Sequence, residues 1–228
     1  MNKVICITFL VVVALASSSL SDQLSKDDYE VYVTVISHEL SRKGNVDSGR
    51  TIVVRSLTFA EHLTTEEGIL ATIDSGGGLS KRSWQRMVAH EKDPRLLDST
   101  IGEIVGTVTA GELAKSFHDH NIGGDTLRSM FTGLPNVILL DEELRHSMLA
   151  RDTSNPRDGG FWDHFYRQFP NSMGTVEFSR VGFSQNRKYA LVYVGYRSGL
   201  LAGHGQLVLL ERQSNGWMIR KTDPLWIS

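Results

Sequence analysis

The stretch KYALVYVGY, residues 188–196, decides the fold of this 228-residue chain. It is rich in β-branched and aromatic residues, as strands are, and successive side chains of a strand point to opposite faces. Its residues form two apolar sets, Ala190, Val192, Val194 and Tyr196 on one face and Tyr189, Leu191 and Tyr193 on the other. We therefore expect helices to cover one side of a sheet here, and the other side to be partly shielded or engaged.

Strand-like segments also flank this stretch on both sides, at 175–183, 206–212 and 217–221, with a last short element at 225–227. Residues 184–187 suit a turn, and Asn215-Gly216 is a strong hairpin signal. These segments predict an antiparallel meander over residues 175–228.

An aromatic helix is expected immediately before the meander. Trp162, Phe165, Tyr166 and Phe169 recur at helical spacing, and Pro170 follows them. Because such a face must lie on apolar surface, the pattern predicts that helix 161–169 packs on the C-terminal sheet.

The preceding chain mixes helices and strands. Ser25 and Asp28 form a capping-box-like pair before an apolar helical stripe that reaches Leu40. Strands are expected at 51–59 and 137–140, and a helix at 142–149. Between 61 and 135 we expect short helices, one of them capped by Thr109 with Glu112 and ended by Asn121 and two glycines. The whole predicts one α+β domain over residues 22–228.

The first 21 residues are expected to be a signal peptide. Lys3 precedes an apolar run from Val4 to Ala16, and small residues follow it, so we expect cleavage near Ala16 to Ser21. The run is short for a membrane span, although an uncleaved anchor is the alternative, and no later segment approaches the required length of about 20 apolar residues. These features predict a secreted or periplasmic protein.

Cysteine content and charge exclude several classes of site and partner. Cys6 is the only cysteine and lies within the signal, so a mature chain would have no disulfide, cysteine nucleophile or thiolate metal ligand. A net charge of −2 offers no overall case for nucleic-acid binding. The C-terminal third is basic, and we expect those charges to dock on the acidic part of the same chain or to be solvated.

His118 and His120, on either side of Asp119, are the best metal candidates because imidazoles suit zinc and similar ions. If this segment is helical, however, residues two apart point about 200° from each other and do not share an ion. The alternative is a polar helix end, where histidines suit the helix dipole.

His204, between two glycines, is the candidate for acid or base catalysis, with Arg180 as an anion holder. The alternative is a bulge or a loop joining two strands, with His204 on the surface, because no carboxylate partner is evident.

Aromatic residues could line a groove for a sugar or peptide, although their spacing favours the core. This set comprises Trp162, Tyr166, Trp217 and Trp226. Asp163 and His164 are expected on the solvent face of the aromatic helix.

A set of short motifs lies along the C-terminal third: Trp162-x-x-Phe165, Phe169-Pro170, Ser179-Arg180-Val181-Gly182-Phe183, Gly203-His204-Gly205, Trp217 and Trp226-Ile227-Ser228. This set resembles a pattern found in uncharacterised exported bacterial proteins. The resemblance implies an exported protein with this architecture and implies no particular reaction.

We therefore expect a binding or envelope-associated interaction protein rather than an enzyme, without a cofactor, whose partner is a protein or a small molecule. The alternatives are a hydrolase-type enzyme using His204 with Arg180 or a metal at His118 and His120, and an inhibitor of another exported protein.

Overall fold

Strands from three separate parts of the chain form one sheet. The computed structural model describes residues 24–42, 49–58, 104–134, 136–154 and 160–228, so the expected signal peptide and the helices expected between 61 and 103 lie outside the described residues. The strands are β1 (Thr51–Arg55), β2 (Val137–Leu140), β3 (Ser172–Phe178), β4 (Gly182–Phe183), β5 (Tyr189–Gly199), β6 (Ala202–Gln213) and β7 (Gly216–Ile227). The helices are α1 (Lys26–Arg42), α5 (Thr107–His120), α6 (Glu142–Ser154) and α7 (Gly160–Gln168).

The order across the sheet is β2-β1-β3-β5-β6-β7, with β4 also paired to β5. Strands β3 to β7 pair antiparallel, which confirms the predicted C-terminal meander within an α+β fold. Strand β1 pairs parallel with both β2 and β3, so the sheet as a whole is mixed. These parallel pairings were not predicted from the sequence.

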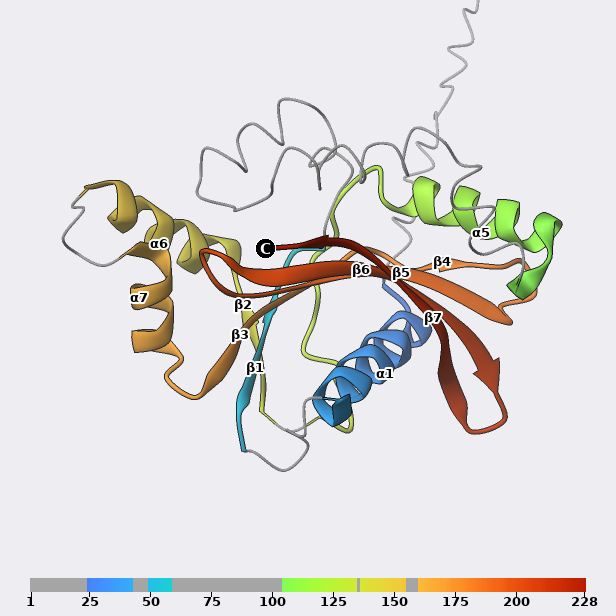
Figure 1. Cartoon of the computed structure of the whole chain (residues 1–228), viewed down its shortest axis with the longest axis horizontal. Helices are drawn as coiled ribbons and strands as arrows, with labels where there is room; N and C mark the ends of the chain where they lie inside the picture. Colours follow the sequence, from blue (N-terminus) through green and yellow to red (C-terminus); the bar gives the residue numbers. More distant parts are fainter. Residues whose placement is uncertain (1–23, 43–48, 59–103, 135, 155–159) are drawn as a thin grey trace, which may run out of the picture.

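Helices cover both faces of the sheet (Figure 1). On one face, α1 packs over the apolar residues of β5 that include Val192 and Val194. On the other face, α5 packs over Leu191 and Tyr193. Helices α6 and α7 lie on this second face as well, at the β1–β2 end of the sheet. Each of the two apolar sets predicted for β5 is therefore covered by a different helix, one by α1 and the other by α5.

The aromatic helix is present as α7, with Phe165 fully buried. Its apolar partners are Val53 in β1 and Leu140 in β2, and it reaches β5 through a hydrogen bond from the Tyr166 hydroxyl to the Ser198 carbonyl oxygen (2.8 Å). The meander is covered by α1 and α5 instead. The aromatic helix lies farther along the sheet than expected because β1 and β2 extend the sheet and need cover of their own.

Local signals account for several element ends. The Ser25 amide and hydroxyl both donate to Asp28 Oδ2, at 2.8 and 2.6 Å, so the predicted cap starts α1. Gly216 has a φ of 126° in the β6–β7 hairpin, a conformation that glycine adopts without steric cost.

Two boundaries differ from the predictions. The predicted strand 175–183 is interrupted, because β3 ends at Phe178 and β4 starts at Gly182. Gly182 lies so close to α5 that a Cβ there would be 2.5 Å from the Phe117 amide nitrogen. Helix α5 starts two residues before Thr109, after Gly106, so the predicted Thr109 cap is wrong.

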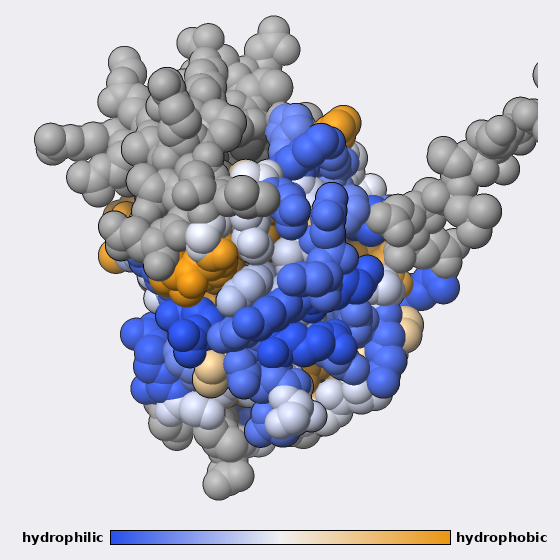
Figure 2. Space-filling view, turned by 90° about the vertical axis from the view of Figure 1, so that its right-hand side faces the viewer, coloured by the Kyte–Doolittle hydropathy of each residue, from blue (hydrophilic) through white to orange (hydrophobic). Residues whose placement is uncertain are grey.

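The basic C-terminal third docks on acidic residues of the same chain. Arg187 and Arg212 both pair with Asp27 at the start of α1, at 3.1 and 2.6 Å. Arg180 pairs with Asp125 at 2.7 Å. The side of the molecule seen in Figure 2 is mainly hydrophilic among its coloured residues. No described helix has the length and hydropathy needed to cross a membrane.

Candidate functional site

His204 lies near the start of β6, opposite Tyr196 of β5 and Ile227 of β7. Its ring stacks on Tyr196 with centroids 4.9 Å apart, and its side chain is 25% exposed. The expected alternative of a surface histidine in a loop between strands is therefore wrong. A register shift does follow at Gly205, as the bulge interpretation predicted.

A buried carboxylate accompanies His204, although none could be assigned from sequence. Glu39 of α1 is 3% exposed, and its Oε1 lies 3.7 Å from His204 Nε2. Arg42 Nε and Nη2 donate to the two oxygens of Glu39 at 3.1 and 3.0 Å. Burial, and then the charge of Glu39, raise the pKa of Tyr196. The cluster joins the end of α1 to β5 and β6.

Arg180 belongs to a different cluster. It lies between β3 and β4, where its amide donates to Asn121 Oδ1 at 2.8 Å and its carbonyl accepts from Asn121 Nδ2 at 3.1 Å. Its guanidinium pairs with Asp125. These contacts fasten the end of α5 to the sheet, whereas His204 lies beside the end of α1.

His118 and His120 are both within α5, so their side chains leave the helix in different directions. His120 Nδ1 lies 2.9 Å from the Val181 carbonyl oxygen. Asp119, between them, pairs with Lys115, which lowers the pKa of Asp119. Among the residues that the structure describes, no group of three or more potential metal ligands occurs.

A buried ionic network lies on the sheet face that carries α5, α6 and α7. Arg55 Nη1 donates to Glu177 Oε2 at 3.0 Å, and Arg55 Nη2 donates to Glu142 Oε1 at 2.9 Å. Arg145 also donates to Glu142, and Arg197 lies 4.0 Å from Glu177. Burial opposes the charged form of Glu177, but Arg197 and Arg55 outweigh that effect, so the pKa of this carboxyl group is lowered.

Two glycines leave space for the side chains of Trp226 and Tyr193, which extend the network from Glu177. The Trp226 indole Nε1 donates to the Tyr193 hydroxyl at 3.1 Å, and that hydroxyl donates to Glu177 at 3.4 Å. A Cβ on Gly205 would lie 2.1 Å from Trp226 Nε1, and one on Gly195 would lie 2.7 Å from Glu177 Oε1. This network was not predicted from the sequence, although Glu177 lies in a run of buried residues in β3 and Arg55 directly follows three buried residues of β1.

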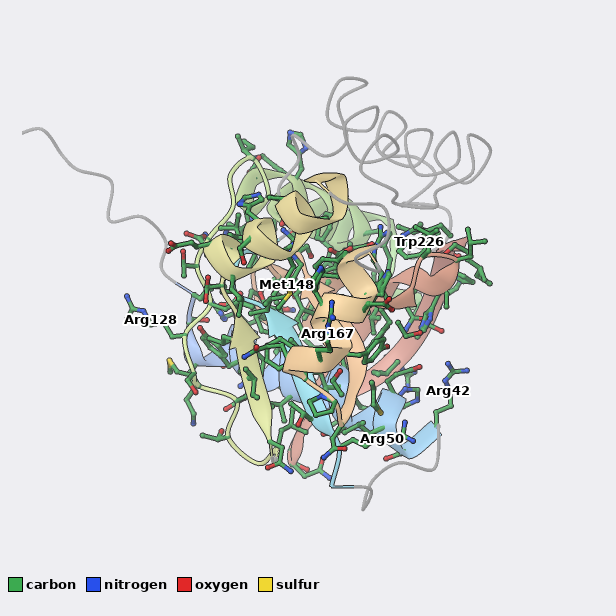
Figure 3. All side chains as sticks on the ribbon, turned by 90° about the vertical axis from the view of Figure 1, so that its left-hand side faces the viewer. Arg42, Arg50, Arg128, Met148, Arg167 and Trp226 are labelled. Carbon is green, nitrogen blue, oxygen red and sulfur yellow. The ribbon has the colours of Figure 1, made fainter. Side chains whose placement is uncertain are left out.

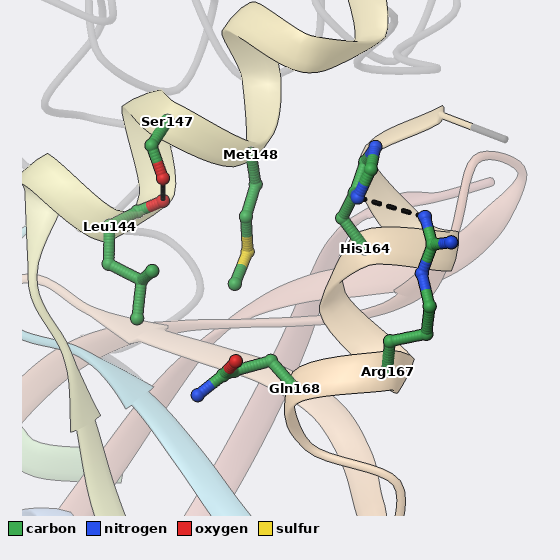
Figure 4. A pocket seen from close by; sticks show the side chains of 6 residues that line it. All are labelled: Leu144, Ser147, Met148, His164, Arg167 and Gln168. Carbon is green, nitrogen blue, oxygen red and sulfur yellow. Dashed lines mark hydrogen bonds between the residues drawn. The ribbon is translucent and has the colours of Figure 1, made fainter. Parts of the chain in front are cut away.

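A cavity of ligand size lies between α6 and α7 (Figure 4) and has a volume of about 440 Å³. Six residues line it: Leu144, Ser147 and Met148 from α6, and His164, Arg167 and Gln168 from α7. Figure 3 shows Met148 and Arg167 on the same side of the molecule. The cavity thus combines an apolar part with several polar groups.

The residues of α7 that line the cavity were placed only in part by the sequence. Asp163 is exposed as predicted, but His164 lines the cavity, where its Nδ1 lies 2.9 Å from Arg167 Nη2. The predicted solvent position of His164 is therefore wrong. The signal available in the sequence was the arginine one turn after the histidine, a spacing at which helical side chains meet.

The four aromatic groove candidates divide into two pairs. Trp217 and Trp226 are buried in separate cores, as the packing interpretation predicted. Trp162 and Tyr166 are half-buried on α7, with ring centroids 5.9 Å apart. No described groove brings all four rings together.

Comparison with known proteins finds no relative of this chain. No family model matches the chain, and neither the curated proteins nor the solved structures yield a match.

Proposed function

We propose that this chain is an exported binding protein that holds a small ligand in the cavity between α6 and α7. The observation that carries the proposal is the cavity itself. Its volume of about 440 Å³ falls within the range of about 300–1,000 Å³ that is usual for ligand sites. Its lining also matches such sites, because the apolar Leu144 and Met148 face the polar side chains of α7.

The other candidate residues support this choice by their contacts. Arg180 fastens α5, the Arg55–Glu177 network joins strands to α6, and Glu39 is held by Arg42. These contacts connect elements of the fold. The cavity between α6 and α7, in contrast, offers space bordered by polar and apolar side chains together.

Export is part of the same proposal. The apolar run from Val4 to Ala16 and the small residues after it support a cleaved signal and a periplasmic or secreted location. An envelope-associated interaction with another protein remains the related form of the proposal, in which the cavity would take a side chain of the partner.

One observation favours the enzyme alternative. The contact between His204 and the buried Glu39 has the form of a carboxylate–histidine pair, which can orient an imidazole for proton transfer. A hydrolase of this type would lose cleavage of p-nitrophenyl acetate in His204→Ala. We expect the wild-type protein and this variant to hydrolyse the ester at the same background rate.

Octanol is a suitable first probe of the cavity because it is small and largely apolar. With methyl-labelled methionine, we expect octanol to shift the Met148 signal and to leave Met218, which is exposed on β7, unchanged. Leu144→Trp should fill the cavity and abolish the shift, whereas the matched change Leu201→Trp, at an exposed hairpin position, should preserve it. A Met148 signal that no probe moves in the folded wild-type protein would overturn the proposal.

A further inference from the structure

Asn215 and Gly216 close the β6–β7 hairpin at the surface of the molecule. The last pair of the ladder joins Gln213 to Gly216, and residues 212–216 are all exposed. Within the part of the chain that the structure describes, the Asn215 side chain forms no hydrogen bond. The position that a Cβ of Gly216 would take meets no atom within 4 Å. Solvent therefore reaches both the side-chain amide of Asn215 and the peptide bond that follows it.

Two other asparagines are held by hydrogen bonds. Asn121 is 7% exposed, and its Nδ2 donates to the Phe117 carbonyl oxygen at 2.7 Å. Asn186 Oδ1 accepts from the Ser184 hydroxyl at 2.9 Å and from the Lys188 amide at 3.0 Å. A reaction of either side-chain amide would first have to break these bonds.

The residue that follows each asparagine separates Asn215 from the remaining described ones. Asn136 and Asn171 are exposed like Asn215, but Val137 and Ser172 follow them. A Cβ on the following residue crowds its amide nitrogen, and glycine lacks this atom. Asn215 is the only asparagine of the chain that glycine follows.

We propose that Asn215 is a site of spontaneous modification, at which the side-chain amide is lost and isoaspartate forms. The Gly216 backbone nitrogen gives its proton to solvent and attacks Cγ of Asn215. The bond from Cγ to the side-chain nitrogen breaks, and ammonia leaves with a proton from solvent. Water then opens the cyclic imide at either carbonyl carbon, which gives isoaspartate or aspartate. The net change consumes water and releases ammonium, so the hairpin gains one negative charge.

The place of this pair in the ladder allows the attack in the folded protein. Stability within a structure is lowest where backbone bonds are exposed and few contacts hold the chain. The Gln213–Gly216 pair is terminal, so it opens without disturbing Trp217, which is buried on the next pair. The Gly216 nitrogen then turns toward the Asn215 side chain while the rest of β6 and β7 stays paired.

Isoaspartate would change the hairpin as well as its charge. Its main chain runs through the former side chain, so the turn gains one backbone atom. The next pair of the ladder is Arg212 with Trp217, where Cζ of Arg212 lies 4.6 Å from the ring centroid and Nη2 binds Asp27 of α1 at 2.6 Å. We expect isoaspartate to shift the NMR signal of the Trp217 indole. Asn215→Asp, which adds the charge without the extra atom, should shift it less.

Incubation of the whole purified protein at mildly alkaline pH tests the proposal. Peptide mapping by mass spectrometry, with an isoaspartyl methyltransferase to detect isoaspartate, would follow each asparagine. We expect isoaspartate and aspartate at position 215, formed faster as the pH rises, while Asn171 stays intact. Asn215→Gln should abolish these products, because a glutamine side chain closes a larger and less favourable ring. The matched change Asn171→Gln, at another exposed asparagine, should leave them unchanged.

Three results would overturn the proposal. One is an intact Asn215 in the folded protein under conditions that convert it in urea, since the hairpin would then protect it. Another is aspartate without isoaspartate, because direct hydrolysis of the side chain needs no Gly216 nitrogen and gives aspartate alone. The third is faster conversion at Asn171, which would show that the following glycine does not select the site. An unmoved Trp217 signal in the isoaspartate form would contradict the effect assigned to the extra backbone atom.

Discussion

Glu177 lies inside the sheet with its carboxylate beside Arg55, Arg197 and the Tyr193 hydroxyl. Moving a carboxylate away from water is unfavourable, and here several donors compensate for that loss. We therefore expect this residue to have a large effect on stability. Removing its charge would leave Arg55 with Glu142 alone and take the carboxylate away from Arg197.

Glu177→Gln should lower the free energy of unfolding by about 3 kcal/mol, because breaking a buried ion pair leaves an uncompensated charge. Denaturant unfolding would measure the change. The matched variant Glu143→Gln, at an exposed position on α6, should stay within about 0.5 kcal/mol of wild type. Equal effects of the two variants would contradict the role assigned to Glu177.

The same residue predicts a dependence on pH. Because the pKa of Glu177 is lowered in the folded state, its contribution is fully present above the unfolded pKa of about 4.3 and is lost as the pH falls through the folded value. The difference in unfolding free energy between wild type and Glu177→Gln should therefore shrink as the pH is lowered below about 4. A difference that grew on acidification would be inconsistent with the lowered pKa.

Gly205 and Gly111 make a contrasting pair of glycine positions. A Cβ at Gly205 would overlap the Trp226 indole, whereas a Cβ at Gly111, inside α5, would meet nothing within 4 Å. We expect Gly205→Ala to destabilise the protein by about 1–3 kcal/mol and Gly111→Ala to stabilise it by about 0.5–1 kcal/mol. Thermal unfolding of the two variants would test both signs.

At the scale of single elements, α1 illustrates how local signals and long-range contacts combine. Its start is set by Ser25 and Asp28, and its buried face packs on the sheet. Its end is joined to β6 through Glu39 and His204. The helix is thus attached at both ends as well as along its length.

Ser25→Ala should destabilise the protein by about 1 kcal/mol, because it removes the hydroxyl that participates in the cap of α1. Ser41→Ala is the matched control, since the Ser41 hydroxyl bonds only within the exposed end of the same helix. Denaturant unfolding of both variants would compare them. A larger effect at Ser41 would mean that the cap does not limit the stability of α1.

The features that were predicted best from the sequence are those that a few neighbouring residues determine. The cap of α1, the Asn215-Gly216 hairpin and the alternation in β5 each depend on a few neighbouring residues, and each is confirmed. The position of α7 along the sheet was not predictable, because it depends on β1 lying beside β3 and on β2 lying beside β1.

The candidate sites follow the same rule. His204 could be selected from its flanking glycines, but its partner Glu39 lies in a helix far away in the sequence. The ionic network joins residues of β1, β3 and α6, and the cavity lies between two helices. The network leaves no spacing pattern in one segment, and the cavity leaves only the spacing of His164 and Arg167 in α7, so neither feature was found before the fold was known.

At the scale of the whole molecule, export remains a prediction. If the signal is cleaved near Ala16 to Ser21, the secreted or periplasmic protein should lack its first 16 to 21 residues. Mass spectrometry of protein from separated cell fractions would measure this loss. Full-length protein recovered from the cytosol alone would contradict it.

If the chain is exported as predicted, the position of β1 also affects how it folds. Ile52 pairs with Val137 and Val53 with Thr175, so neither neighbour of this apolar strand has been synthesised when the strand itself emerges. Pairing of such distant segments is slow, and an unpaired apolar strand invites aggregation in the meantime. A chain threaded outward from its N-terminus would therefore depend on a chaperone to shield Ile52 to Val54 until the last third has arrived.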